Sequence, residues 1–302
     1  MSQPLVDPNR LRQFATHTRR KLIVHEKYLR QCVVMARKYG NFRYIEAHGG
    51  TGLIRIDGEI IEGSLLQAAR LAPSTSCTVV EIDPDRYRTL KEVIDNKGLV
   101  NVDVILGDCN VEVPQLLGKI PAWRQFVLCF VDPDGYMYHE GDIRVPEFTP
   151  TLLDAIASFP RSELLMTLPL TIRRNVGYVL KRPLDPKSKA YEEGLKMTLG
   201  EECLKRVAVS YEPFYLNLVD FVLERYFQPY KYRGALLVKS AEGVLQYYLI
   251  FGSQNETAGT IMRNVMKKEW EDQSGREVSE LPPLDSFIFD DRLSQPRLRF
   301  TT

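Results

Sequence analysis

The residues Phe42-Arg-Tyr-Ile-Glu-Ala-His-Gly-Gly-Thr-Gly52 set the architecture of this chain. Residues 42–47 are rich in aromatic and β-branched side chains and include neither Gly nor Pro, which predicts a short buried strand. The strand is expected to end near Glu46 and to run into a glycine turn, where backbone N–H groups can approach a ligand that a Cβ would block. A glycine cluster after a strand also describes an ordinary tight turn, so the order of the segments after Gly52 decides between the two interpretations.

Strand-like and helix-like segments alternate along the first half of the chain. A helix is expected at 19–39, after a polar segment, 1–18, that is expected to form a loose arm. The expected strands are 42–47, 77–83, 102–106, 125–131 and 163–168. The helices between them are expected at 63–72, 85–97, around Leu116 and at 148–159. This alternation predicts a doubly wound, Rossmann-like α/β fold with a mostly parallel sheet and ligands at the strand carboxyl ends.

Three segments depart from the alternation. Residues 53–62, with Asp57-Gly58 as the turn, are expected to form a hairpin that could fold over a ligand. Residues 171–230 are expected to be a helical insertion on the substrate side. Two strands, 235–239 and 247–251, then predict an antiparallel hairpin at the sheet edge. A last helix is expected at 257–271, so the α/β domain covers 19–271 and leaves 272–302 as an unassigned tail.

The composition limits the class of protein. With 302 residues, 44% of them apolar, the chain can bury a large core. Its net charge of +1 argues against a protein that coats nucleic acid, but it leaves room for a local basic patch. The five cysteines show no CxxC or Cys/His spacing, so neither a metal site nor a disulfide framework is predicted. No apolar run resembles a signal peptide or a membrane span, and a cytoplasmic protein is expected.

Four strands end on an acidic residue: Glu46, Glu81, Asp108 and Asp132. Any one of them alone is more simply a solvated loop residue. Together, at the edge where parallel strands end, they predict a ligand site. Glu81 suits the ribose hydroxyls of a nucleoside, Asp108 with the Cys109 backbone suits an adenine amino group, and Glu46 suits an ammonium group.

These roles together predict a site for S-adenosylmethionine, because acids favour its cationic sulfonium. The turn lacks the GxGxxG spacing, and Gly52 lies 29 positions before Glu81 instead of about 20, which disfavours NAD. Asp83, followed by Pro84, is expected to cap the next helix. The predicted cofactor-binding residues are Glu46, His48, Gly49, Gly50, Gly52, Glu81, Asp108 and Cys109.

The segment Asp132-Pro133-Asp134-Gly135-Tyr136 is similar to the Asp-Pro-Pro-Tyr motif of amino-group methyltransferases. In that motif the acid and the next carbonyl hold a planar amine, and the aromatic ring stacks on its ring system. The predicted catalytic residues are therefore Asp132, Pro133 and Tyr136. The chain departs from the motif at Asp134-Gly135, and the same residues also suit a type I turn.

Across roughly 20–270 the chain resembles the three-Cys-motif partner proteins. The resemblance rests on Lys21-x3-His-x2-Tyr-Leu29, the glycine turn with Gly63-Ser64, Glu81-Ile-Asp-Pro84, Gly107-Asp108 and Val131-Asp-Pro-Asp-Gly-Tyr136. The family usually has Phe-Ala-Gly-Pro-Gly in place of the residues beginning at Ala47, and Gly-Ser-Pro in place of Gly63-Ser64-Leu65. The resemblance implies a class I methyltransferase-like fold, S-adenosylmethionine, and a cysteine-motif partner protein.

The substrate side offers a further hint. Residues 171–189 carry six basic side chains that could pair with phosphates, although a solvated helix explains them equally well: Arg173, Arg174, Lys181, Arg182, Lys187 and Lys189. One hypothesis is a methyltransferase that modifies a base nitrogen in RNA or DNA. The second is a catalytically idle, nucleoside-binding partner subunit of a larger complex, and a third, weaker one is an NAD-dependent enzyme.

Overall fold

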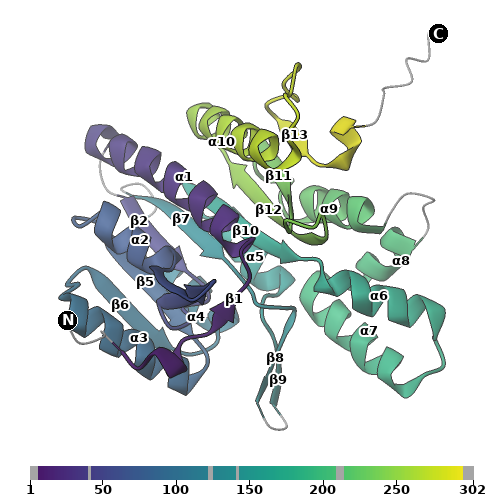
Figure 1. The fold of residues 1–302 in the computed structure, drawn as a ribbon, viewed down its shortest axis with the longest axis horizontal. Helices are drawn as coiled ribbons and strands as arrows, with labels where there is room; N and C mark the ends of the chain where they lie inside the picture. The colour runs from purple at the N-terminus through teal and green to yellow at the C-terminus, as the bar shows by residue number, and fades with distance from the viewer. Residues whose placement is uncertain (1–5, 40–41, 122–124, 141–142, 209–213, 295–302) are drawn as a thin grey trace.

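The computed structural model describes residues 6–39, 42–121, 125–140, 143–208 and 214–294 (Figure 1). Its central element is an eight-stranded sheet with the spatial order β6-β5-β2-β7-β10-β12-β11-β13. These strands are β2 (Phe42–Glu46), β5 (Ser76–Glu81), β6 (Val102–Leu106), β7 (Phe126–Val131), β10 (Ser162–Pro169), β11 (Tyr232–Lys239), β12 (Leu245–Ser253) and β13 (Ser286–Phe289).

The direction of the strands identifies the fold. Strands β6, β5, β2, β7 and β10 run parallel, whereas β12 is antiparallel to both of its neighbours, β10 and β11. When the seven strands β2, β5, β6, β7, β10, β11 and β12 are numbered 1 to 7 along the chain, their order across the sheet is 3-2-1-4-5-7-6. This order, with the seventh strand reversed, is that of the class I methyltransferase fold and confirms the predicted fold class.

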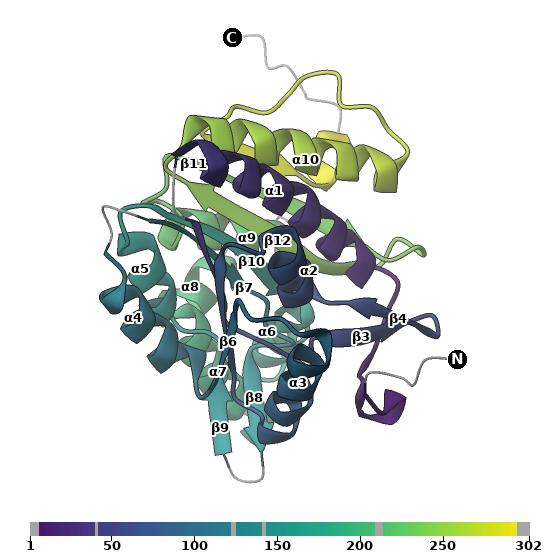
Figure 2. The same ribbon diagram turned by 90° about the vertical axis from the view of Figure 1, so that its left-hand side faces the viewer.

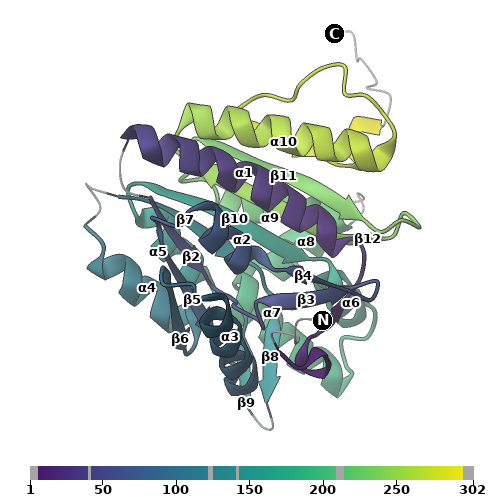
Figure 3. The ribbon, with the colours of Figure 1, turned by 60° about the vertical axis from the view of Figure 1, so that its left-hand side comes forward.

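Ten α-helices accompany the sheet in the described part of the chain. They are α1 (Thr18–Tyr39), α2 (Ser64–Leu71), α3 (Pro84–Lys97), α4 (Cys109–Lys119), α5 (Pro150–Ser158), α6 (Thr171–Lys181), α7 (Pro186–Leu199), α8 (Glu202–Ala208), α9 (Phe214–Arg225) and α10 (Glu256–Ser274). Helices α1 and α10, from opposite ends of the chain, lie side by side on one face of the sheet, and α4 and α5 cover the other (Figures 2 and 3).

Burial on both faces explains the composition of the central strands. From its second residue on, β7 is buried throughout, and so is all of β10. Strands covered by helices on both faces are continuously apolar rather than alternating, as the sequence of β7 shows. Helix α3 begins where it was predicted, because the Asp83 side chain accepts hydrogen bonds from the Asp85 and Arg86 amides and Pro84 occupies the first turn.

Residues 6–17 of the N-terminal segment are not loose, contrary to the prediction, and residues 1–5 lie outside the described residues. Within it, a 3₁₀ turn (Pro8–Arg10) precedes β1 (Gln13–Phe14), which pairs in parallel with β3 (Leu53–Ile56) of the predicted hairpin, whose second strand is β4 (Glu59–Glu62). Val6 and Leu11 are buried in a small cluster with residues of β3, α2 and α3. The sequence did not predict this cluster, because Val6 and Leu11 are isolated apolar residues in a polar segment and the other members come from distant parts of the chain.

Two further elements were not predicted. The hairpin β8 (Met137–Glu140) and β9 (Ile143–Pro146) comes directly after Asp132–Tyr136 and projects from the body of the protein (Figure 1). In the tail, β13 pairs with β11 and is followed by a 3₁₀ turn (Asp291–Ser294). Among the described residues, no helix combines the length and the apolar character needed to span a membrane.

Candidate functional site

A cavity of about 410 Å³ lies where β2, β5, β6 and β7 end. The strand order reverses around β2, which is the position at which open α/β sheets bind ligands. The structure brings all eight predicted cofactor-binding residues into the lining: Glu46, His48, Gly49, Gly50, Gly52, Glu81, Asp108 and Cys109. Asp132 lines the same cavity. Four strand ends that are distant in sequence therefore meet in one site.

The glycine turn is packed closely against the protein on one side. A Cβ on Gly49 would lie 2.8 Å from Val79 Cγ2, and a Cβ on Gly52, whose φ is +73°, would lie 2.7 Å from Leu90 Cδ1. At Gly50, φ is +58° and a Cβ would meet no atom within 4 Å. Gly49 and Gly52 thus allow the turn to approach β5 and α3, while Gly50 adjoins open space.

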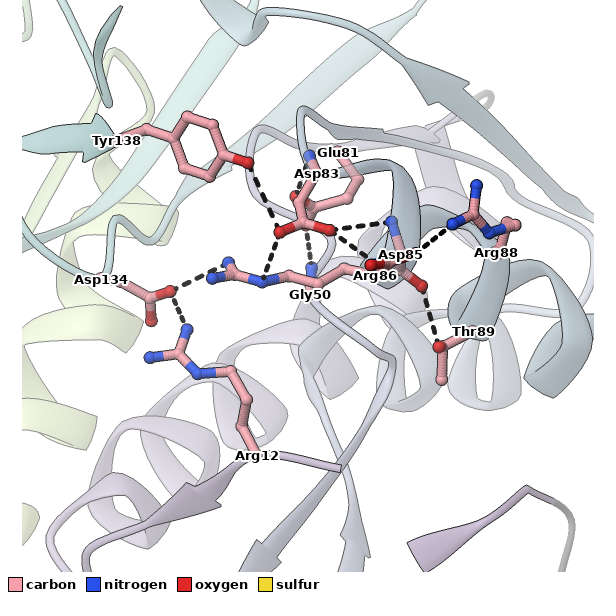
Figure 4. A network of polar contacts seen from close by, with 10 residues as sticks. All are labelled: Arg12, Gly50, Glu81, Asp83, Asp85, Arg86, Arg88, Thr89, Asp134 and Tyr138. Atoms are coloured by element: carbon pink, nitrogen blue, oxygen red, sulfur yellow. Dashed lines mark hydrogen bonds and ion pairs between the residues drawn. The ribbon is translucent and has the colours of Figure 1, made fainter. Parts of the chain in front are cut away.

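Glu81 joins the glycine turn to the end of β5. Its carboxylate accepts a hydrogen bond from the Gly50 amide (2.6 Å) and one from the Asp83 amide (2.9 Å) (Figure 4). Burial raises the pKa of Glu81, although these two amides oppose that effect. Each carboxylate oxygen retains a second lone pair, so Glu81 can still accept hydrogen bonds from a ligand. Nothing in the sequence indicated that this acid also shapes the turn.

Asp108 follows the end of β6 and is the N-cap of α4. Its Oδ1 accepts hydrogen bonds from the Asn110 backbone amide (2.9 Å) and from Asn110 Nδ2 (2.8 Å). The cap places the Asp108 carboxylate at the cavity wall beside Cys109, which is buried. The helix cap therefore fixes the orientation of an acid that was predicted to contact adenine.

Asp132 is held by an ion pair with Lys21 of α1. Lys21 Nζ donates to Asp132 Oδ2 over 2.5 Å, and the two side chains are 13% and 16% exposed. Lys21 Nζ also lies 6.0 Å from the centre of the Tyr247 ring. The other oxygen, Asp132 Oδ1, is buried and has no hydrogen-bond partner in the described structure. The motif at 132–136 did not indicate Lys21, because that residue is more than a hundred positions away.

Two arginines hold the second acid of the motif. Asp134 forms ion pairs with Arg12, from the N-terminal segment, and with Arg86 of α3 (3.2 Å) (Figure 4). Burial disfavours the ionised form of Asp134, but the two guanidinium groups outweigh it, and the pKa is lowered. Asp134 is therefore ionised and paired, and its ion pair with Arg12 holds the N-terminal segment at the cavity. Its role was left open by the sequence.

His48 leaves one buried nitrogen without a partner. Its Nε2 lies 2.8 Å from the Glu147 carbonyl oxygen. A carbonyl oxygen only accepts, so Nε2 donates. Nδ1 is buried and unpaired in the described structure. The Cys109 thiol donates to the same carbonyl over 3.2 Å. His48 Nδ1 and Asp132 Oδ1 are thus two unsatisfied polar atoms in the residues that line one cavity.

Glu46 belongs to a buried hydrogen-bonded chain beneath the cavity. Ser64 Oγ donates to Glu46 Oε1 (2.6 Å), and Tyr44 Oη lies 2.7 Å from Glu46 Oε2 and 3.0 Å from His25 Nε2. His25 Nδ1 lies 3.1 Å from Gln67 Oε1. Burial raises the pKa of Glu46 to about 7 and lowers that of His25 to about 4.

The proton count of this chain favours a protonated Glu46. A neutral His25 that donates from Nδ1 to Gln67 leaves its Nε2 as an acceptor for the Tyr44 hydroxyl. The single hydroxyl proton of Tyr44 is then donated to His25 Nε2. The proton in the hydrogen bond between Tyr44 Oη and Glu46 Oε2 must therefore come from the Glu46 carboxyl group. All the members are then satisfied without a buried charge, which agrees with the raised pKa of Glu46.

Two predicted catalytic residues do not line the cavity. Pro133 is buried beside Asp132. The Tyr136 ring packs against α7, where a Cβ on Gly194 would lie 2.8 Å from it, and Thr198 Oγ1 donates to the Tyr136 carbonyl (3.0 Å). The structure therefore brings Asp132 to the predicted cofactor residues, but it keeps Tyr136 against the helical insertion.

The charge of the cavity is strongly unequal. Seven acidic side chains, three basic ones (Arg12, Lys21 and Arg86) and two histidines (His48 and His139) belong to the residues that line it. The acids are Glu46, Glu81, Asp83, Asp108, Asp132, Asp134 and Glu147. Such surroundings favour a ligand with positive charge. Within the described residues, no group of three or more metal-binding side chains is arranged to hold a metal ion.

Comparison with known proteins shows similarity at the level of the overall fold only. No family model matches the sequence, and no curated protein matches it. A SAM-dependent methyltransferase from Agrobacterium tumefaciens is 14% identical, with a TM-score of 0.44, over 77% of this chain. This chain spans 62% of the length of that protein.

Two other solved structures are similar at the same level. Protein LPL1258 from Legionella pneumophila is 13% identical, with a TM-score of 0.49, over 82% of this chain and 91% of its own. Cofactor-bound Rv0187 from MTB is 13% identical, with a TM-score of 0.38, over 76% and 79%. At these values the similarities establish neither reaction nor substrate, and the fold class rests on the strand order of the sheet.

Proposed function

We propose that this protein is an S-adenosylmethionine-dependent methyltransferase that modifies a nitrogen of a base in RNA or DNA. The observation that carries the proposal is the convergence of Glu46, Glu81 and Asp108 around the glycine turn in one acidic cavity. The cavity volume of about 410 Å³ lies within the range of about 300–1,000 Å³ of small-molecule sites. The unsatisfied His48 Nδ1 and Asp132 Oδ1 indicate that the lining is completed by a ligand.

Each group of the lining suits one part of the cofactor. Glu81 would accept hydrogen bonds from the ribose, and Asp108 would accept one from the adenine amino group. Glu46 would face the ammonium group, whose positive charge would favour loss of the Glu46 proton on binding. The backbone of Gly49, Gly50 and Gly52 allows close approach of the ligand. When bound, the cofactor supplies a methyl group on a positively charged sulfur.

Asp132 is the proposed orienting group for the target amine. Lys21 holds Oδ2, so Oδ1 is left to accept an N–H from the target, with the Pro133 carbonyl as the second acceptor. Two such acceptors direct the nitrogen lone pair toward the methyl donor, and the rate gain comes mainly from positioning. Stacking by Tyr136 requires that its ring first leave the contact with α7.

The proposal includes membership of the three-Cys-motif partner family. The motifs that carry the resemblance include residues of the cavity, such as Lys21, Glu81, Asp108 and Asp132. A cysteine-motif protein is then the expected protein partner, and the cytoplasm is the expected location.

Calorimetric titration with S-adenosylmethionine tests the cofactor. The wild-type protein should bind it, and Asp108→Asn should bind about tenfold or more weakly, because a hydrogen bond to a charged group contributes about 1.5–3 kcal/mol. Asp85→Asn is the matched control, since Asp85 is 85% exposed on the neighbouring helix α3. Failure of the wild-type protein to bind, or equal binding by Asp108→Asn, would refute the proposed cofactor site.

Methyl transfer is tested with radiolabelled cofactor and total cellular RNA or DNA. Asp132→Ala should abolish the incorporation of label while circular dichroism remains unchanged. The second candidate is an idle, nucleoside-binding subunit. It is favoured by the Lys21–Asp132 ion pair and by the position of Tyr136 outside the cavity lining. Cofactor binding without transfer to any nucleic acid would support that candidate.

A further inference from the structure

A second hollow, which shares no lining residue with the cavity, lies between α6 and the β11–β12 hairpin. It has a volume of about 730 Å³ and is lined by Arg174, Lys181 and Arg182 from one side and by Val244 and Gln246 from the other. We propose that this basic groove binds the sugar-phosphate backbone of a single-stranded nucleic acid substrate. The inference rests on the proposed function, because a nucleic acid whose backbone lies in the groove would present its target base to the cavity.

Charge distribution is the first argument. The chain as a whole carries +1, whereas residues 171–191 hold six basic residues and one acid, a net charge of +5. All three groove cations are exposed, and none forms an ion pair with another described residue. Elsewhere Arg10, Arg19 and Arg20 are each paired with a carboxylate. A row of unpaired cations is the electrostatic feature that phosphate groups recognise.

The acidic cavity makes a separate phosphate site necessary. The excess of acidic over basic side chains in the lining favours a cationic cofactor but repels a polyanion. A nucleic acid that presents one base to Asp132 must therefore find its attraction outside the cavity. The groove has the required sign.

Contacts link the groove to the segment Asp132–Tyr136. Gln246, in the groove wall, accepts a hydrogen bond from the Leu170 amide (3.0 Å). The next residue, Tyr247, lies against Lys21, which holds Asp132. On the other side, Asn175 of α6 hydrogen-bonds to the Tyr136 side chain. The groove and the Asp132–Tyr136 segment thus share α6 and β12 as supports.

The groove is suited to the backbone of a strand rather than to its bases. The Arg182 guanidinium lies 5.3 Å from the centre of the Tyr178 ring, so that ring is already in contact with a cation. An anionic membrane is the competing partner, since Leu184 and Val244 are 94% and 59% exposed. The hollow shape favours a strand, because a flat membrane surface contacts protrusions rather than grooves.

Fluorescence anisotropy of a labelled single-stranded RNA provides the test. The triple variant Arg174→Glu/Lys181→Glu/Arg182→Glu should bind at least about tenfold more weakly than wild type. Its slope of log affinity against log salt should be smaller by about 2, as expected for three lost phosphate contacts. The control Lys27→Glu/Lys91→Glu/Lys119→Glu makes the same change of charge at exposed positions of α1, α3 and α4 and should retain binding.

The outcomes separate this inference from the proposed function. Cofactor binding, measured on both triple variants, should equal that of wild type, which also shows that they are folded. If wild type binds the cofactor but not RNA, or if both triple variants lose RNA binding equally, the groove assignment is wrong and the cofactor site stands. Charge-dependent binding to phosphatidylserine vesicles without RNA binding would also overturn it.

Discussion

Replacement of Glu46 by Gln should remove a pH dependence of stability that the buried chain beneath the cavity creates. Glu46 is 2% exposed, and burial raises its pKa in the folded protein to about 7, against 4.5 for an unperturbed carboxyl group. Between these two values the unfolded chain loses a proton that the folded protein keeps. Wild-type stability is therefore lost as the pH rises from about 4.5 through about 7.

The magnitude follows from the shift. Each pKa unit corresponds to 1.36 kcal/mol, so a rise from 4.5 to about 7 corresponds to about 3 kcal/mol. A Gln side chain at position 46 can donate to Tyr44 Oη and accept from Ser64 Oγ, as the protonated carboxyl does. The variant should match wild type below about pH 4 and exceed its stability by about 3 kcal/mol near pH 8.

Denaturant unfolding of both proteins across this pH range measures the difference. Subtracting the wild-type free energy of unfolding from that of the variant at each pH cancels the contribution of all other titrating groups, because these groups are common to both proteins. Glu277→Gln, at an exposed position, is the matched control and should show no pH-dependent difference from wild type. A Glu46→Gln difference that stays constant from about pH 5 to about pH 8 would show that Glu46 is not held protonated.

Three other predictions test the packing of the site. Gly52→Ala should destabilise the protein and weaken cofactor binding more than Gly58→Ala, because both have positive φ but only at Gly52 would the Cβ collide, with Leu90; equal thermal shifts would contradict this. Lys21→Met and Asp132→Asn should couple in a double-mutant cycle by about 1 kcal/mol or more, since each leaves a largely buried group unpaired; additive effects on unfolding would contradict the pairing. Gly234→Ala should release β13, because its Cβ would lie 2.2 Å from the Phe287 ring, and limited trypsin digestion after Arg276 should become faster than in wild type.

The sequence by itself determined the α/β architecture and the set of strand ends at the cavity. Regular alternation of strand and helix leaves few possible topologies, and it places the carboxyl ends of parallel strands at one edge. Glu46, Glu81, Asp108 and Asp132 could therefore be assigned to one site before their positions in space were known. The cap at Asp83 was equally accessible, because it depends on residues that are neighbours in sequence.

Only the tertiary structure decided which distant side chains complete that site. The ion pairs of Lys21 with Asp132 and of Arg12 with Asp134, the position of Tyr136 against α7, and the addition of β13 all join segments far apart in the chain. Local sequence carries no record of such partners, because it is the packing of one element on another that brings them within bonding distance. The basic groove has the same origin: its cations are visible in the sequence, but their arrangement beside β12 results from how α6 packs after β10.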